Sequence, residues 1–215
     1  MPKRVSHSPL DPFLTTPLKG WLYPRLNLPA RLPPEGIVLA GHVAAIAGAI
    51  GFAISASAWW GGLLAALGVA LNHTADVLDG THARATGQCR NGGELLDHFV
   101  DPLSFSYWVT GIAYAADCLL VGIGGVVVIY ATAVLTNIKA KMVGEFTLAR
   151  FGPTEFKALL VLLGAGLSLI TGGWWFSRQA APRVAFWFAL VMFVAGLLQL
   201  LLSLRIAVRE VNERG

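Results

Sequence analysis

The sequence has little charge and few cysteines. Asp, Glu, Lys and Arg make up 13% of the 215 residues, half of the roughly 25% that is typical of soluble domains. Hydrophobic residues reach 55% and glycine adds 24 positions, which excludes a disordered chain and is unlike an ordinary soluble globule. The two cysteines, Cys89 and Cys118, form no CxxC pair. We therefore predict neither a disulfide framework nor a cysteine zinc site.

Charge is absent over long parts of the chain. Four stretches hold at most one charged residue each: 36–75, 102–138, 158–177 and 184–204. A helix that spans a bilayer needs about 20 mostly apolar residues, and the first stretch is long enough for two. We therefore predict an all-α, polytopic membrane protein with six transmembrane helices, at 37–55, 61–82, 93–116, 118–138, 158–174 and 184–205.

The predicted helices divide the chain into an N-terminal segment (1–36), a six-helix membrane domain (37–208) and a short tail (209–215). The first segment lacks the apolar core and cleavage site of a removable signal peptide. Its prolines at positions 12, 17, 24, 29, 33 and 34 exclude a long helix. The stretch 13–23 mixes apolar and basic residues and is suited to lie flat in the headgroup region; a poorly ordered tail is the alternative.

Basic residues predict the orientation in the membrane. Fourteen of the 16 Lys and Arg residues fall before helix 1, between helices 2 and 3, between helices 4 and 5, or after helix 6, whereas Arg178 and Arg183 lie on the other side. By the positive-inside rule, both termini and both long loops are cytoplasmic. We expect an integral protein of a bacterial inner membrane or an equivalent membrane, and no nucleic-acid partner, because topology accounts for the positive charge.

Four aspartates interrupt helices 2 and 3. Asp76, Asp79, Asp97 and Asp101 lie inside these helices or at their cytoplasmic ends, where each carboxylate would cost about 2.5 to 3.5 kcal/mol at the helix centre. The members of each pair are three or four residues apart and therefore share a helix face. Because 87–93 is rich in Gly, it allows a tight reversal that brings the two faces together.

Converging carboxylates need a cation, because they would otherwise repel one another and become protonated. Mg²⁺ or Mn²⁺ prefers oxygen ligands, and two such ions about 3.5 to 4 Å apart commonly assist in-line displacement at phosphorus. We predict that Asp76, Asp79, Asp97 and Asp101 hold two ions.

Small residues and one arginine accompany the acids. Gly80 lacks a Cβ and Ala83 is small, so a nucleotide can approach the backbone of helix 2, and Gly93 serves likewise across the cleft. Arg84 is suited to bind diphosphate oxygens in a bidentate manner. The alternative for Arg84 is a topology arginine that snorkels to the interface.

These residues together carry a family resemblance. The chain reads Asp76-x-x-Asp79-Gly80-x-x-Ala83-Arg84, then eight residues, then Gly93-x-x-x-Asp97-x-x-x-Asp101. This resembles the complete signature of the CDP-alcohol phosphotransferases at all eight fixed positions. The resemblance implies that an acceptor hydroxyl displaces CMP from a CDP-linked donor, that Asp101 is the general base, and that the protein is a homodimer.

The branch of the family and its substrates are less determined. The run Gly93-Glu-Leu-Leu-Asp97-His98 and the run Gly-Pro-Thr-Glu at 152–155 resemble the choline and ethanolamine phosphotransferases. That branch implies a CDP-aminoalcohol donor and a diacylglycerol-like acceptor, although this chain is shorter than its ten-helix members. The alternative is a CDP-diacylglycerol-dependent phosphatidyltransferase acting on a polar alcohol or polyol phosphate. Basic residues in the loop before helix 5 are suited to hold such a phosphate, although topology alone also explains them: Lys139, Lys141, Arg150 and Lys157.

Two other classes of protein remain. A cation-coupled transporter would use intramembrane acids as a relay, but no second copy of the acidic motif occurs. A degenerate regulatory homologue would not need intact acids.

Among the histidines, we expect His98 to orient the base or share its proton, and His73 and His82 either to line the nucleotide pocket or to pack. Helix glycines are predicted small-residue contacts: Gly41, Gly48, Gly51, Gly122, Gly124, Gly125, Gly164 and Gly166.

Overall fold

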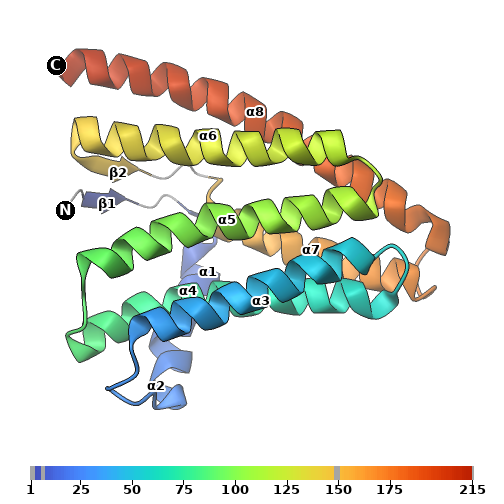
Figure 1. The fold of residues 1–215 in the computed structure, drawn as a ribbon, viewed down its shortest axis with the longest axis horizontal. Helices are drawn as coiled ribbons and strands as arrows, with labels where there is room; N and C mark the ends of the chain where they lie inside the picture. The colour runs from blue at the N-terminus through green and yellow to red at the C-terminus, as the bar shows by residue number, and fades with distance from the viewer. Residues whose placement is uncertain (1–2, 6–7, 148–150, 215) are drawn as a thin grey trace.

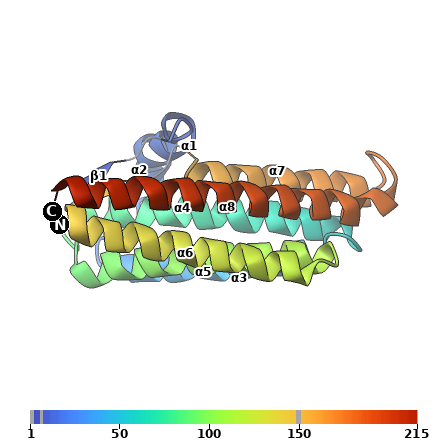
Figure 2. The same cartoon turned by 90° about the horizontal axis from the view of Figure 1, so that it is seen from above.

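The computed structural model describes residues 3–5, 8–147 and 151–214. Its long helices run side by side (Figures 1 and 2) and are α3 (Pro34–Ile54), α4 (Trp59–Thr86), α5 (Asn91–Ala115), α6 (Leu119–Val143), α7 (Pro153–Thr171) and α8 (Ala181–Arg214). The short elements are β1 (Lys3–Val5), α1 (Asp11–Pro17), the π-helix η1 (Leu18–Leu22), α2 (Tyr23–Leu26), β2 (Glu145–Thr147) and the 3₁₀-helix η2 (Arg178–Ala180). The strands β1 and β2 pair in parallel.

The all-helical membrane architecture is confirmed, but the count of six spans is not. Among the described residues, five segments are long and apolar enough to cross a bilayer: α3, α4, α6, α7 and the unit Arg178–Arg214 that contains α8. The helix α5 has 25 residues and packs along α3 and α6, but its acids and buried serines make it more polar than the others. A sixth span at α5 therefore stays a prediction.

The start of α7 differs from the prediction. The helix begins at Pro153, five residues before the expected 158, with Gly152 as its N-cap. The carboxylate of Glu155 accepts a hydrogen bond from the Gly152 N–H at 2.9 Å, and proline is favoured in the first turn because it has no N–H to satisfy. Lys157 consequently lies inside α7. Its predicted place in a loop was wrong.

The N-terminal segment forms three short helical elements in succession over Asp11–Leu26. Pro17 ends α1, and the chain widens to a π-helix directly after it, since proline has no N–H for the preceding turn. Phe13 and Trp21 are 75% and 59% exposed, as an interfacial segment requires. The Tyr23 hydroxyl, 3.0 Å from Nδ1 of His82, ties this segment to α4.

Close backbone contacts hold the helices together. A Cβ built on Gly68 would lie 2.5 Å from the Cα of Gly48, and one built on Gly62 would lie 2.4 Å from the carbonyl oxygen of Gly164. These positions require glycine because the helices α3, α4 and α7 touch there. Seven of the eight predicted glycine contacts are confirmed; Gly166 has no described atom within 4 Å of a Cβ.

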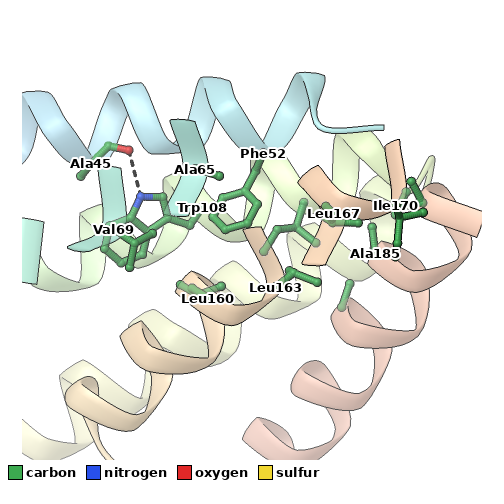
Figure 3. Packing of buried hydrophobic residues seen from close by; sticks show 14 residues of the cluster. Ala45, Phe52, Ala65, Val69, Trp108, Leu160, Leu163, Leu167, Ile170 and Ala185 are labelled. Atoms are coloured by element: carbon green, nitrogen blue, oxygen red, sulfur yellow. Dashed lines mark hydrogen bonds between the residues drawn. The ribbon is translucent and has the colours of Figure 1, made fainter. Parts of the chain in front are cut away.

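A buried apolar core supports the acid-bearing segments (Figure 3). Phe52, Val69, Trp108 and Leu160 are fully buried, and the Trp108 Nε1–H donates to the carbonyl of Ala45 at 2.9 Å. Trp108 follows the acids of α5 by two helical turns, so this packing limits how α5 can rotate.

One end of the bundle collects the polar segments. Both termini, the α4–α5 connection and β2 lie at this end (Figure 1). We call it the acid end because the four aspartates lie in the halves of α4 and α5 next to their connection. Gly87 ends α4 with φ +71°, a left-handed conformation that favours glycine. The predicted reversal is thus present, although Gly92 and Gly93 already belong to α5.

Candidate functional site

The aspartates of α4 and α5 meet at the acid end. One carboxylate oxygen from each of Asp76, Asp97 and Asp101 lies within 4.8 Å of the other two. Asp79 lies outside this triad but lines the same small cavity, is 7% exposed and accepts a hydrogen bond from the N–H of Gly80. The structure therefore brings three of the four predicted ligands together, with the fourth beside them.

The triad fits a hard divalent cation. All its donors are carboxylate oxygens, which suit Mg²⁺ or Mn²⁺ better than softer metals, and the three side chains are half-buried. Their spacing allows one ion to contact all three. The identity and the number of ions stay predictions.

Lys157, which the sequence suggested as one of four phosphate-binding residues, instead contacts the acid triad. Nζ of Lys157 donates to Oδ2 of Asp76 at 2.9 Å and to Oδ1 of Asp101 at 3.2 Å. The Lys157 side chain is 2% exposed, and its Nζ lies 5.6 Å from the centre of the Phe105 ring. The signal for it was the Gly-Pro-Thr-Glu run at 152–155, which predicts a helix start and puts Lys157 in the second turn.

The N-terminal segment holds the first turn of α7. The Glu155 carboxylate accepts hydrogen bonds from the Ser8 hydroxyl and from the Leu10 N–H, the latter at 3.3 Å. The Thr154 hydroxyl donates to Oδ1 of Asp11 at 2.8 Å. These contacts position the turn from which the lysine side chain reaches the acids.

The predicted nucleotide wall lies on the next turns of α4. A Cβ built on Gly80 would lie 3.3 Å from Nη1 and 3.5 Å from Nη2 of Arg84, so the guanidinium covers the glycine. Ala83 is half-buried and Arg84 is exposed. Gly93, in the first turn of α5, has no described atom within 4 Å of a Cβ. The backbone is thus open at Gly93, whereas the Arg84 side chain lies over it at Gly80.

The histidines differ in their surroundings. His82 is fully buried; its Nδ1 faces the Tyr23 hydroxyl and its Nε2 faces the carbonyl of Leu32, each at 3.0 Å. Its role is packing, one of the two predicted alternatives. His73 has both ring nitrogens buried without a hydrogen-bond partner among the described residues. His98 lines a large, mainly apolar cavity beside the acids.

A cavity of about 500 Å³ adjoins the acids. It lies between α5, α6, α8 and the start of α7, and none of the described residues that line it comes from α3 or α4. Its lining is mainly apolar and includes Phe105, Val109, Ile129, Phe156, Met192 and Phe193.

The cavity runs along most of the bundle. Asp97 and Asp101 line it at the acid end, and Val121 lines it near the other end. On α6, Lys139 and Val121 both line it and are 18 residues apart, about 27 Å along a helix. That length is close to the roughly 30 Å of a bilayer's hydrocarbon core. The cavity therefore has the length and polarity to hold hydrocarbon chains.

The predicted phosphate-binding cations have other partners or lie apart. Lys139 borders the cavity at the acid end but pairs with Glu210 at 2.7 Å. Lys141 is exposed at the end of α6. Arg150 lies outside the described residues.

Comparison with known proteins agrees with the signature. Residues 37–195 match the family model described as CDP-alcohol phosphatidyltransferase. The phosphatidylinositol phosphate synthase of Mycolicibacterium smegmatis is 30% identical over 178 residues, which are 80% of this chain and 77% of that protein. Cholinephosphotransferase 1 of Gallus gallus is 32% identical over 126 residues, 56% of this chain but 35% of that protein. A crystal structure of Mycobacterium tuberculosis phosphatidylinositol phosphate synthase with CDP-DAG bound aligns over 90% of this chain with a TM-score of 0.47 and 18% identity.

Proposed function

We propose that this chain, which belongs to the CDP-alcohol phosphatidyltransferase family, uses a CDP-aminoalcohol donor and a diacylglycerol-like acceptor. Its similarity to a phosphatidylinositol phosphate synthase and to a cholinephosphotransferase supports a transferase of membrane phospholipid synthesis. The products are an aminoalcohol phospholipid and CMP. The position of the large cavity carries this choice of substrates.

The cavity touches the acid cluster on the side of the proposed base. Asp101, Asp97 and His98 line it, whereas Gly80 and Arg84, the proposed nucleotide wall, belong to α4 and do not. A lipid in the cavity would present its polar end to Asp101. This position supports a lipid nucleophile and, with it, a small aminoalcohol on the donor.

The chemistry then follows from the residues around the acceptor hydroxyl. The Asp101 carboxylate accepts the proton of that hydroxyl. The hydroxyl oxygen forms a bond to the transferred phosphorus, and the bond from this phosphorus to the bridging oxygen of CMP breaks, so that CMP leaves with the bonding electrons. Asp101 later releases its proton to solvent.

The remaining signature residues bind and orient the donor. Asp76, Asp79 and Asp97, with Asp101, would hold the divalent ions, which when bound neutralise diphosphate charge. Arg84 pairs with diphosphate oxygens. Gly80, Ala83 and Gly93 keep the walls thin enough for the nucleotide to approach the backbone.

We also propose that the acid end faces the cytoplasm and that the protein is a homodimer. The connections and termini at the acid end carry most of the basic residues, while Arg178 and Arg183 lie beyond the opposite end of α7, which supports this orientation. The homodimer rests on the family resemblance.

A second candidate is a CDP-diacylglycerol-dependent phosphatidyltransferase. The similarity to a phosphatidylinositol phosphate synthase over 80% of this chain favours it. In that case the cavity would hold the hydrocarbon of the donor, and a polar alcohol or polyol phosphate would reach Asp101 from water.

One assay separates the candidates. Purified protein with Mn²⁺ or Mg²⁺ is given CDP-ethanolamine or CDP-choline plus diacylglycerol in one reaction, and CDP-diacylglycerol plus polyols or polyol phosphates in another, with Asp101→Asn as the control. We expect CMP release in the first reaction. Release only in the second would refute the aminoalcohol donor. Release in neither, combined with cation uptake by proteoliposomes, would support the transporter instead.

A further inference from the structure

The acid cluster already contains a cation from the chain itself. Lys157 is buried, and its ammonium bonds one oxygen of Asp76, from α4, and one oxygen of Asp101, from α5. We propose that Lys157 occupies the cation position between these two carboxylates when no divalent ion is bound, and that the ammonium and a divalent ion compete for it. The inference rests on the proposed function only in taking the acids as the ion site.

The geometry makes simultaneous binding unfavourable. Asp76 and Asp101 supply two of the three oxygens that lie within 4.8 Å of one another, and Lys157 bonds both residues at 2.9 and 3.2 Å. An ion that bridges the same carboxylates at its usual oxygen distance, about 2.0 to 2.1 Å for Mg²⁺, brings like charge next to the ammonium. We therefore expect the two cations to compete for the shared carboxylates.

The position of Lys157 is determined by the fold around it. The α7 N-cap at Gly152 and the contacts of Glu155 and Thr154 with the N-terminal segment hold the helix start against the acids. The nearby Phe105 ring adds a cation–π contact. A buried charge is costly unless it is paired, and the lysine offsets part of the carboxylate charge of the cluster.

Competition has a measurable consequence for affinity. The divalent ion must displace the ammonium before it binds, so the wild-type protein should bind the ion more weakly than the carboxylates alone allow. Removing the ammonium should strengthen ion binding and, at the same time, destabilise the ion-free protein. A lysine that only contacts a substrate phosphate would change neither property.

The first experiment measures Mn²⁺ binding to the detergent-purified protein by calorimetry, without substrate. We expect Lys157→Met to bind Mn²⁺ at least tenfold more tightly than wild type, and Lys157→Arg, which keeps the charge, to stay near wild type. Lys139→Met is the matched control, because it removes a paired lysine at the same end of the bundle; we expect a change below threefold. Equal affinity of Lys157→Met and wild type would overturn the inference.

The second experiment compares thermal unfolding in chelator and in saturating Mn²⁺. Lys157→Met should unfold at a lower temperature than wild type in chelator. The difference should close in Mn²⁺, because the bound ion then neutralises the carboxylates in both proteins. A difference that persists in Mn²⁺ would mean that Lys157 stays on the acids beside the ion, contrary to the proposal. If the variant folds only with metal, purification in Mn²⁺ followed by chelator titration yields the same affinity.

These outcomes also distinguish the two proposals. If every variant binds Mn²⁺ with wild-type affinity, the competition is refuted and the proposed metal-dependent transfer stands. If neither wild type nor Lys157→Met binds Mn²⁺, both the ion site and the competition are refuted.

Discussion

Filling the far end of the apolar cavity should slow turnover of a long-chain lipid and leave the chemistry at the acids unchanged. Val121 lines the cavity on α6, 15 residues before Thr136, which lines it near the acid end; that separation is about 22 Å along a helix. Val121→Trp therefore blocks space that only a long chain reaches. A short-chain acceptor, such as dioctanoylglycerol, should still present its hydroxyl to Asp101.

The expected magnitude comes from steric cost. A chain that moves from the bilayer into the cavity exchanges one apolar surrounding for another, so hydrophobic transfer contributes little. Overpacking a filled apolar site costs about 1 to 3 kcal/mol, which corresponds to a loss of roughly 5- to 140-fold in kcat/KM. We expect that loss with long-chain diacylglycerol and less than a twofold loss with the short-chain acceptor.

The assay is CMP release with each acceptor at saturating CDP-aminoalcohol. The matched control is Leu120→Trp, which introduces the same side chain at a neighbouring position that is 84% exposed. Turnover of the short-chain acceptor also reports that Val121→Trp is folded, which matters because Val121 packs against the core. Equal losses for both chain lengths, or equal behaviour of the two variants, would refute the placement of hydrocarbon in the cavity.

Three further predictions test the acids, the nucleotide wall and the orientation. Asp97→Asn and Asp101→Asn should both abolish CMP release, and Mn²⁺ calorimetry should find the larger loss of binding in Asp97→Asn; normal turnover by either variant would contradict the assignment. Gly80→Leu should lose CDP-donor binding in equilibrium dialysis yet keep Mn²⁺ binding, whereas unchanged donor affinity would put the nucleotide elsewhere. In intact cells, an impermeant maleimide should label Cys118 in preference to Cys89, and the reverse preference would overturn the orientation. Because burial raises the pKa of the Cys118 thiol, labelling should accelerate as pH rises and the thiolate fraction grows.

Local sequence patterns predicted the parts of this protein that depend on neighbours along the chain. The charge-free stretches predicted the long apolar helices, since a span depends on about 20 consecutive residues. The spacing of Asp76 to Asp79 and of Asp97 to Asp101 predicted shared helix faces, because the helical period is local. The start of α7 was also readable from Gly152 to Glu155, although the predicted span began only at residue 158.

Only the tertiary structure decided the contacts between helices that are distant in sequence. Lys157 and Asp76 are 81 residues apart, and no local period encodes that α7 packs against α4 with this lysine directed at the acids. The position of the cavity on the α5 side, away from Gly80, likewise depends on how α6 and α8 lie against α5. By itself the sequence determined which acids converge, because their spacing along two helices is local. The packing of the helices determined the lysine that contacts these acids and the side on which the apolar cavity meets them, because both depend on side chains that meet only after the helices assemble.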